Sequence, residues 1–409
     1  MPAAVSTLWL AGRPGVGAVA AAALLDAFGT PEAVYAADRA ALISACPLRK
    51  AQVDALCDKN LDEAERIVET CAKKDIRILT IADSAYPDRL RAIADPPLAL
   101  YVRGRWPDFD VTLGITVVGT REATAYGIEI AEALGRALAR AGFLTVSGMA
   151  LGADGAAHRG ALRAGGLTVA ALAGGVDICY PPQNRALMGD ILLAGAVISE
   201  LPPGSEPKGT NYRARNRILS GLSVATVVVE AADFRSGALI TARHALDQGR
   251  DVYAVPGMLG AKQSAACNEL IERGEAALLT GPDALVRAYS GLLRVQPDER
   301  RVREAFFRQT DQWPVPAEKS AWDEIAARES AQRQAEPPVK RKSPPAKEPS
   351  SIEHLSADEQ TLVTLIRQGA SSPAEVMERC DLPAARVMAL LTMLEMNGVI
   401  RREKGRLVP

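Results

Sequence analysis

Six predicted strands in the middle of the chain are each followed, at once or after one intervening residue, by glycine, a small hydroxyl residue or a charged residue. The strands are predicted from short apolar runs rich in β-formers, at Gly114–Val118, Phe143–Val146, Thr168–Leu172, Ala196–Ile198, Val224–Val229 and Asp251–Val255. The residues that follow them are, in chain order, Gly119-Thr120-Arg121, Ser147-Gly148-Met149-Ala150, Gly174-Gly175, Ser199-Glu200, Glu230-Ala231 and Pro256-Gly257. Ligands of open parallel sheets bind outside the carboxyl ends of the strands, so we expect these residues to converge on one site.

The residue types in this set suit a phosphate group. Glycines allow the backbone to approach an anion closely, and helix N-termini present free N–H groups. Arg121 adds a forked cation that can hold phosphate through two bonds. Ser236 and Gly237 open a helix with small residues, which is a further start suited to an anion. The predicted phosphate-binding residues are Gly119, Thr120, Arg121, Ser147, Gly148, Ala150, Gly174, Gly175, Ser236 and Gly237.

A second segment, residues 212–217, combines an aromatic ring, an amide and cations. It consists of Tyr212, Arg213, Ala214, Arg215, Asn216 and Arg217. This combination suits neutralisation of backbone phosphates with one base stacked on Tyr212. The alternative is a basic surface turn that caps the following helix, and the segment alone does not decide between the two.

The main alternative function is enzymatic. A nucleotide-binding or N-glycoside-cleaving enzyme of the lysine-decarboxylase-like Rossmann type would need an acid/base set such as Asp154, Glu200 and Glu230. The P-G-G-x-G-T signature of that group is absent, because Pro256-Gly257 is followed by Met258-Leu259. No G-x-G-x-x-G follows a strand and no P-loop motif occurs. We therefore predict no catalytic residue, and expect Asp154 and His158 to hold the strand-to-helix loop.

Composition narrows the function classes further. The 409 residues carry 48 basic and 49 acidic side chains and a net charge of −1, so phosphate binding requires a local patch. The six cysteines and three histidines form no zinc spacing, and we predict no metal, no cofactor, reduced thiols and a cytoplasmic location. The N-terminal residues do not resemble a secretion signal. No apolar run reaches the ~18 residues of a membrane span, so no membrane contact is expected.

The elements that position these residues divide the chain into four parts. Residues 1–75 are predicted as a small helical domain of helix-hairpin-helix or SAM-like type, and residues 76–294 as an α/β domain with a Rossmann-like parallel sheet. Residues 295–350 are predicted as a Pro-rich charged linker. Residues 351–409 are predicted as a winged-helix domain, with helix starts at Ser356 and Ser372, a third helix over Pro383–Asn397 and a basic wing after it.

The predicted winged-helix domain suggests a second alternative function, that of a transcription factor specific for double-stranded DNA. Its candidate recognition helix, Pro383–Asn397, has Arg386 as its only cation. Major-groove readers usually place several polar or basic side chains there, so an accessory or protein-contacting role is favoured.

The central domain resembles the bacterial DNA-processing protein A (DprA/Smf) family. The matching runs over roughly residues 80–275 are VVGTR, SGMALGAD, AGGVDICYPPQN, ISELPPG, RARNRILSGLS, VVVEA, SGALITA and VYAVPG. The resemblance implies a DNA-binding Rossmann-like core that binds single strands, self-associates as a homodimer or larger assembly, and protects incoming DNA and loads RecA recombinase in natural transformation. The chain departs from the family at Tyr212-Arg213, where members often carry Phe-Pro, but the aromatic ring is kept.

Overall fold

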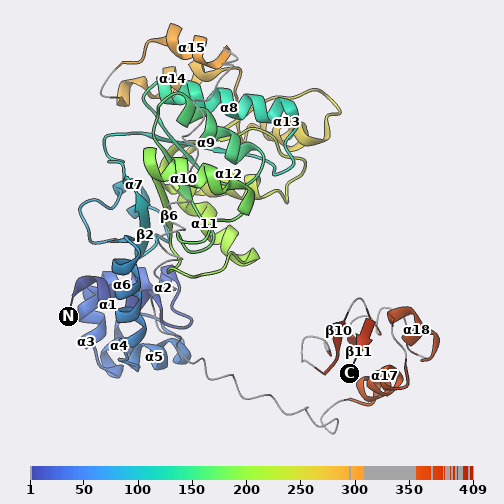
Figure 1. The fold of residues 1–409 in the computed structure, drawn as a ribbon. Helices are drawn as coiled ribbons and strands as arrows, with labels where there is room; N and C mark the ends of the chain where they lie inside the picture. The colour runs from blue at the N-terminus through green and yellow to red at the C-terminus, as the bar shows by residue number, and fades with distance from the viewer. Residues whose placement is uncertain are drawn as a thin grey trace. The chain divides into compact units, whose positions relative to one another are not determined.

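The computed structural model describes residues 2–293, 296–307, 356–369, 372–380, 382, 387, 390–391, 394, 399–403 and 406–408 (Figure 1). The chain divides into two compact units, residues 1–335 and residues 336–409. Each unit is described by itself. Among the described helices, none combines the length and apolar character needed to cross a membrane.

The first unit opens with a group of short helices, as the sequence predicts, and Figure 1 shows them together at one end of the unit. They are α1 (Ala3–Ala11), α2 (Ala18–Phe28), α3 (Pro31–Ala36), α4 (Arg39–Ala45), α5 (Lys50–Cys57) and α6 (Asp62–Lys73). Gly29 ends α2 with a φ of 82°, a backbone angle that favours glycine. The buried side chains of these helices share one hydrophobic cluster with Ile191 and Val197 of the α/β region. The helices are therefore packed onto the sheet.

A nine-stranded sheet forms the centre of this unit, in the order β1-β2-β6-β5-β4-β3-β7-β8-β9. Its strands are β1 (Arg77–Thr80), β2 (Ala99–Gly104), β3 (Gly114–Val118), β4 (Leu144–Ser147), β5 (Thr168–Ala171), β6 (Ala196–Ser199), β7 (Ser223–Val228), β8 (Asp251–Ala254) and β9 (Ala277–Leu278). The predicted parallel sheet is confirmed from β6 to β9 of this order. β1 and β2 were not predicted, and they extend the sheet beyond β6 in antiparallel pairing.

Helices cover both faces of the sheet. They are α7 (Asp88–Arg91), α8 (Ala125–Arg140), α9 (Ala153–Arg163), α10 (Arg185–Ala194), α11 (Gly209–Gly221), α12 (Gly237–Asp247), α13 (Ala265–Glu272) and α14 (Pro282–Tyr289). Val118 of β3 packs in a cluster with α7, α11, α12 and α13. Its neighbour Val117 packs in another cluster with α8, α9 and α14. Strands buried on both faces explain the near-continuous apolar runs that made them predictable.

One helix lies inside the range predicted as a linker. Residues 299–307 form α15 (Glu299–Phe307), and Val302 is buried in the cluster that contains α8 and α14. The Nε of Arg136 on α8 also donates a hydrogen bond to the carbonyl of Ala305, at 3.2 Å. α15 therefore packs on the α/β region. Most of the predicted linker lies outside the described residues, and the four-part division of the chain stays a prediction.

The second unit contains α17 (Ala357–Arg367), α18 (Pro373–Glu378) and an antiparallel pair, β10 (Arg401–Glu403) with β11 (Arg406–Val408). Ser356 and Glu359 form the predicted capping box of α17, and Ser372 caps α18. The apolar positions predicted for the third helix are buried in the core of this unit, namely Val387, Leu390, Leu391 and Leu394. The other residues of Pro383–Asn397 lie outside the described residues.

Candidate nucleic-acid interface

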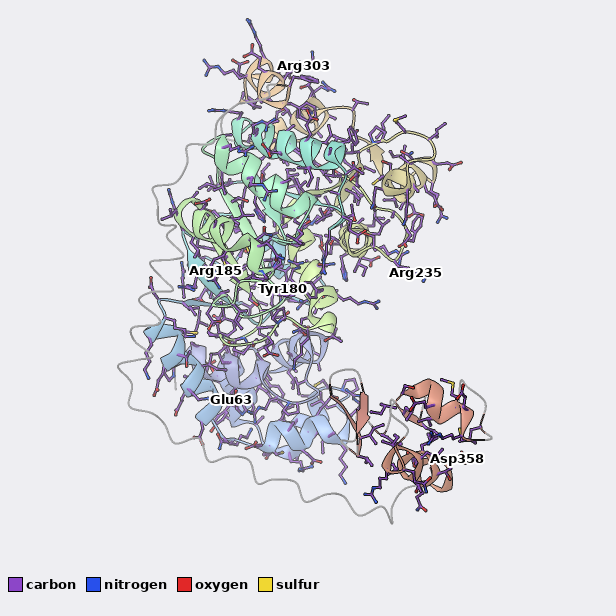
Figure 2. All side chains as sticks on the ribbon, turned by 45° about the vertical axis from the view of Figure 1, so that its right-hand side comes forward. Glu63, Tyr180, Arg185, Arg235, Arg303 and Asp358 are labelled. Atoms are coloured by element: carbon purple, nitrogen blue, oxygen red, sulfur yellow. The ribbon has the colours of Figure 1, made fainter. Side chains whose placement is uncertain are left out.

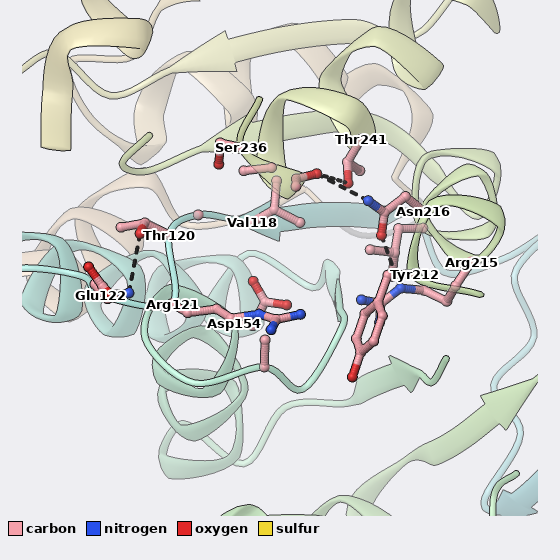
Figure 3. A pocket seen from close by; sticks show the side chains of 15 residues that line it. Val118, Thr120, Arg121, Glu122, Asp154, Tyr212, Arg215, Asn216, Ser236 and Thr241 are labelled. Atoms are coloured by element: carbon pink, nitrogen blue, oxygen red, sulfur yellow. Dashed lines mark hydrogen bonds between the residues drawn. The ribbon is translucent and has the colours of Figure 1, made fainter. Parts of the chain in front are cut away.

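A pocket of about 310 Å³ lies at the carboxyl ends of β3 and β4 and at the start of α12 (Figure 3). Successive strands continue from β3 to one side through β4, whereas β7 pairs on the other side, so the pocket sits where the strand order reverses. The predicted residues that line it are Gly119, Thr120, Arg121, Ala150, Asp154, Tyr212, Arg215, Asn216, Ser236 and Gly237. The structure thus brings together the main parts of the expected site.

Arg121 and Tyr212 face each other in this pocket. The Cζ of Arg121 lies 4.9 Å from the centre of the Tyr212 ring. Arg121 is exposed, and within the described residues no carboxylate forms an ion pair with it. A guanidinium on an aromatic face keeps its in-plane N–H groups available, so Arg121 can donate to an anion.

The segment 212–217 lies inside helix α11, so the alternative of a surface turn is wrong. A helix places residues three and four positions apart on one face. Tyr212, Arg215 and Asn216 accordingly line the pocket, whereas Arg213 is exposed outside its lining. Arg217 is buried elsewhere, with Nη2 2.7 Å from Glu200 and Nε 3.0 Å from Asp95. Of the residues predicted in this segment, Arg217 is committed to ion pairs within the protein.

Arg215 lines the pocket but is itself buried. Its Nη1 donates to the carbonyls of Gly148, at 3.0 Å, and of Ala171, and its Nε donates to Asn216 Oδ1 at 3.1 Å. Burial lowers the pKa of Arg215, and the nearby charge of Asp154 opposes that change. Burial likewise raises the pKa of Asp154, against the charge of Arg215. Arg215 therefore joins α11 to the ends of β4 and β5.

The first turn of α12 forms another wall of the pocket. Asn216 Nδ2 donates to the carbonyl of Gly237 at 3.1 Å, which fixes the start of this helix against α11 (Figure 3). The N-cap residue Ser236 makes no side-chain capping hydrogen bond. The first N–H groups of a helix have no acceptor within the helix, and the helix dipole favours negative charge there. This end of α12 can bind an anion.

Four predicted phosphate-binding residues do not line the pocket and instead pack within the protein. Ser147 is buried, and its Oγ donates to the carbonyl of Val117 at 2.6 Å. A Cβ at Gly148 would collide with the Arg215 guanidinium. Gly174 and Gly175 lie against the segment 202–207, where Cβ atoms would come within 2.9 Å of backbone atoms. At these three glycines, the space that was expected to admit a ligand is filled by other parts of the protein.

Asp154 and His158 occupy the loop and helix expected of them. Asp154 Oδ2 accepts from the N–H of Gly148 at 3.1 Å. His158 Nδ1 lies 2.6 Å from Thr168 Oγ1, and that hydroxyl donates to the carbonyl of Thr145 at 2.9 Å. A hydroxyl has a single proton to donate, so Nδ1 carries the hydrogen and Nε2 is bare. Among the described residues Nε2 has no partner, and burial lowers the pKa of His158 to about 3.

This environment predicts a dependence of stability on pH. The unfolded chain binds a proton on His158 near pH ~6.5, whereas the folded chain resists it. The stabilising contribution is complete above that pH and is lost as the pH falls toward about 3. Urea unfolding of the wild type should therefore show stability falling by up to about 1.4 kcal/mol per pH unit below pH ~6.5 from this group. His158→Gln should flatten the curve between pH ~6.5 and ~5, above the range in which most carboxyls titrate. An unchanged curve would contradict this account.

The three carboxylates considered for catalysis each have structural partners. Buried Glu230 accepts from the N–H of Thr124 at 2.9 Å and from its Oγ1 at 2.6 Å. These bonds hold the carboxylate at the N-terminus of α8, where the helix dipole stabilises it. Glu200 is paired with Arg217, and Asp154 is buried under the pocket. The set therefore does not share one accessible reaction site.

The sequence did not predict Tyr180 as a site residue. Its ring centre lies 6.5 Å from that of Tyr212, and 47% of the residue is exposed. The signal was present, because Tyr180 follows Gly174 and Gly175 in the same loop of a chain that is only 4% aromatic. It adds an exposed ring to the edge of the site, beside the half-buried ring of Tyr212.

Comparisons with known proteins fit this geometry. A family model described as DNA recombination-mediator protein A matches residues 77–290, which is more than half of the chain. The chain belongs to this family of DNA-processing proteins. A second model, described as DprA winged helix domain, matches residues 344–406 and assigns the fold of the second unit.

Individual relatives of the family agree with that assignment. The chain is 36% identical over 240 residues to "Protein Smf" of Synechocystis, covering 58% of this chain and 60% of that protein. It is 36% identical over 218 residues to "DNA processing protein DprA" of Bacillus subtilis, covering 53% of this chain and 73% of that protein. The X-ray structure of DNA processing protein A from Streptococcus pneumoniae superposes with a TM-score of 0.61 at 29% identity, over 69% of this chain and 97% of that one.

Proposed function

We propose that the protein binds single-stranded DNA in the pocket between β3, α11 and α12, as a recombination mediator in the cytoplasm. The observation that carries this proposal is the exposed Arg121 guanidinium on the Tyr212 ring, beside the open start of α12. One backbone phosphate would bind to Arg121, the loop at Gly119 and Thr120, and the first N–H groups of α12. One base would stack on Tyr212.

Single strands are favoured over duplex for a steric reason. In a duplex each base is stacked between its neighbours, and its face is not available to a protein ring. Tyr212 can contact a base face only if the strand is unpaired. A mediator of this kind holds the strand by its backbone and one or more exposed bases, without sequence readout.

The first test is a titration of the full chain with single-stranded and double-stranded oligonucleotides of equal length at several salt concentrations. We expect tighter binding of the single strand. We also expect a linear fall of log affinity with log salt, because bound phosphates release counterions. Equal or tighter binding of the duplex at moderate salt would contradict the proposal.

We further propose that the bound strand is handed to RecA recombinase, so that the protein protects incoming DNA and loads RecA in natural transformation. The family's description as a recombination mediator supports this step. Self-association as a homodimer or larger assembly would link several pockets and raise the effective concentration of the strand. The test is RecA filament formation on strands already covered by single-strand-binding protein, with and without this protein.

The proposed role includes no catalytic turnover. This is supported by the commitment of Asp154, Glu200 and Glu230 to partners within the protein. Incubation with nucleotides and nucleosides should release neither free base nor phosphate. The N-glycoside-cleaving alternative would be favoured by two results together. The protein would release free base or phosphate, with this release lost in Glu230→Gln, and it would not stimulate RecA filament formation.

A further inference from the structure

Tyr180 and Tyr212 form an aromatic pair from two separate elements. Tyr212 belongs to α11, and Tyr180 lies in the loop between β5 and α10 (Figure 2). Their ring centres are 6.5 Å apart and their planes are inclined by 63°. Tyr180 does not line the 310 Å³ pocket, so the pair extends the site beyond it.

The loop that carries Tyr180 is anchored on both sides of this residue. Before it, Asp177 accepts from the N–H of Gly204 at 2.8 Å and forms an ion pair with Lys74 at 2.6 Å. After it, Asn184 Nδ2 donates to the carbonyl of Met149 at 2.9 Å. A ring held in place before binding loses less conformational freedom when a ligand arrives.

The geometry of the two rings suits successive nucleotides. One base cannot lie flat on both rings, because the rings are inclined by 63°. Their separation of 6.5 Å is also about twice the ~3.4 Å rise per nucleotide of a stacked strand. Bases that use both rings must therefore be separated from each other, which only an unpaired and extended strand allows.

The order of the sheet gives the direction in which the strand would run. The pocket lies at β4, β3 and β7, with the Tyr180 loop beyond it after β5. On the opposite side, Tyr126 donates its hydroxyl proton to the carbonyl of Pro256, which follows β8. Exposed cations lie near Tyr180 in the sequence, on α11 beside Tyr212 and directly before α11, namely Arg185, Arg213 and Lys208.

We propose that Tyr180 is a second base-stacking residue, and that a single strand leaves the pocket over Tyr212 toward Tyr180 and not toward Tyr126. This inference rests on the proposed single-strand binding and extends it. It assigns the nucleotide next to the one on Tyr212 to Tyr180, and it predicts that the Tyr126 side contributes no stacking.

The test uses fluorescence anisotropy with full-length protein and oligothymidines of increasing length. Tyr180→Ala should weaken binding by about 5- to 100-fold, as for loss of one stacked base, and only for oligonucleotides long enough to reach beyond Tyr212. Tyr180→Phe keeps the ring and should bind like the wild type. Tyr126→Ala removes a ring of similar exposure, 44% against 47%, and should have no effect.

The outcomes separate this inference from the proposed function. If the wild type does not bind oligothymidine, the proposed function itself fails. If Arg121→Ala weakens binding but Tyr180→Ala does not, the function stands and the assignment of Tyr180 is overturned. A loss in Tyr126→Ala would reverse the direction of the strand. Photocrosslinking of 5-iodouracil oligonucleotides to the Tyr180 peptide gives a second measurement, independent of the stability of any variant.

Discussion

Replacing Arg215 with alanine should lower the free energy of unfolding by about 3–5 kcal/mol. The variant removes the donor from the carbonyls of Gly148 and Ala171 and leaves Asp154 buried without the charge that opposes its desolvation. Removing one partner of a buried charge pair is more damaging than removing both. Equilibrium urea unfolding followed by far-ultraviolet circular dichroism would measure the loss.

The matched control is Arg213→Ala, two residues away on the same helix. Arg213 is exposed, so its loss should change the unfolding free energy by no more than about 0.5 kcal/mol. The double variant Arg215→Met with Asp154→Asn should recover part of the stability, because no uncompensated charge remains buried. A fully stable Arg215→Ala that binds DNA weakly would instead support the direct phosphate contact predicted from the sequence.

Arg121→Ala should weaken single-strand binding by about 1–3 kcal/mol, or roughly 5- to 150-fold in Kd, without changing stability. Arg121 is exposed and contacts Tyr212, so little of the fold depends on it. Loss of one phosphate contact should also reduce the slope of log affinity against log salt by about 1. Anisotropy titrations at several salt concentrations measure both quantities.

Two control variants test whether the effect depends on the position of the positive charge and on the shape of the side chain that carries it. Arg66→Ala removes the same charge from α6, outside the pocket, where the side chain is 70% exposed. It should leave affinity nearly unchanged. Arg121→Lys keeps the charge but not the planar fork, and should fall between wild type and alanine. Equal binding by Arg121→Ala and the wild type would remove this residue from the site.

The parallel core and the centre of the site could be predicted from the sequence because both follow from a repeated local signal. Apolar runs such as Gly114–Val118 indicate strands buried on two faces, and the residue types after them indicate an anion. The position of β2 in the sheet could not be predicted in this way, because its antiparallel pairing with β6 joins segments that are almost one hundred residues apart. Pairing partners at that separation are not encoded locally.

The roles of individual arginines could not be read from the sequence. Arg213, Arg215 and Arg217 are neighbours in the chain, but the helix directs one to solvent, one beneath the pocket and one to Glu200. Glycine is equally ambiguous, since the space it leaves can admit a ligand or another part of the protein. At Gly148 it admits the Arg215 guanidinium, and only the tertiary structure distinguishes these uses.

The ion pair between Lys74 and Asp177 limits where chimeras of this protein and its relatives can be joined. Lys74 directly follows α6, the last N-terminal helix, and Asp177 belongs to the loop of Tyr180, where the Asp177 side chain is only 4% exposed. A chimera that exchanges the N-terminal helices as a cassette would place a foreign residue opposite this buried carboxylate. Unless the relative that provides these helices has a cation at this position, Asp177 in the loop of Tyr180 loses its ion-pair partner. A junction at residue 75 would therefore separate two residues that form an ion pair in this protein.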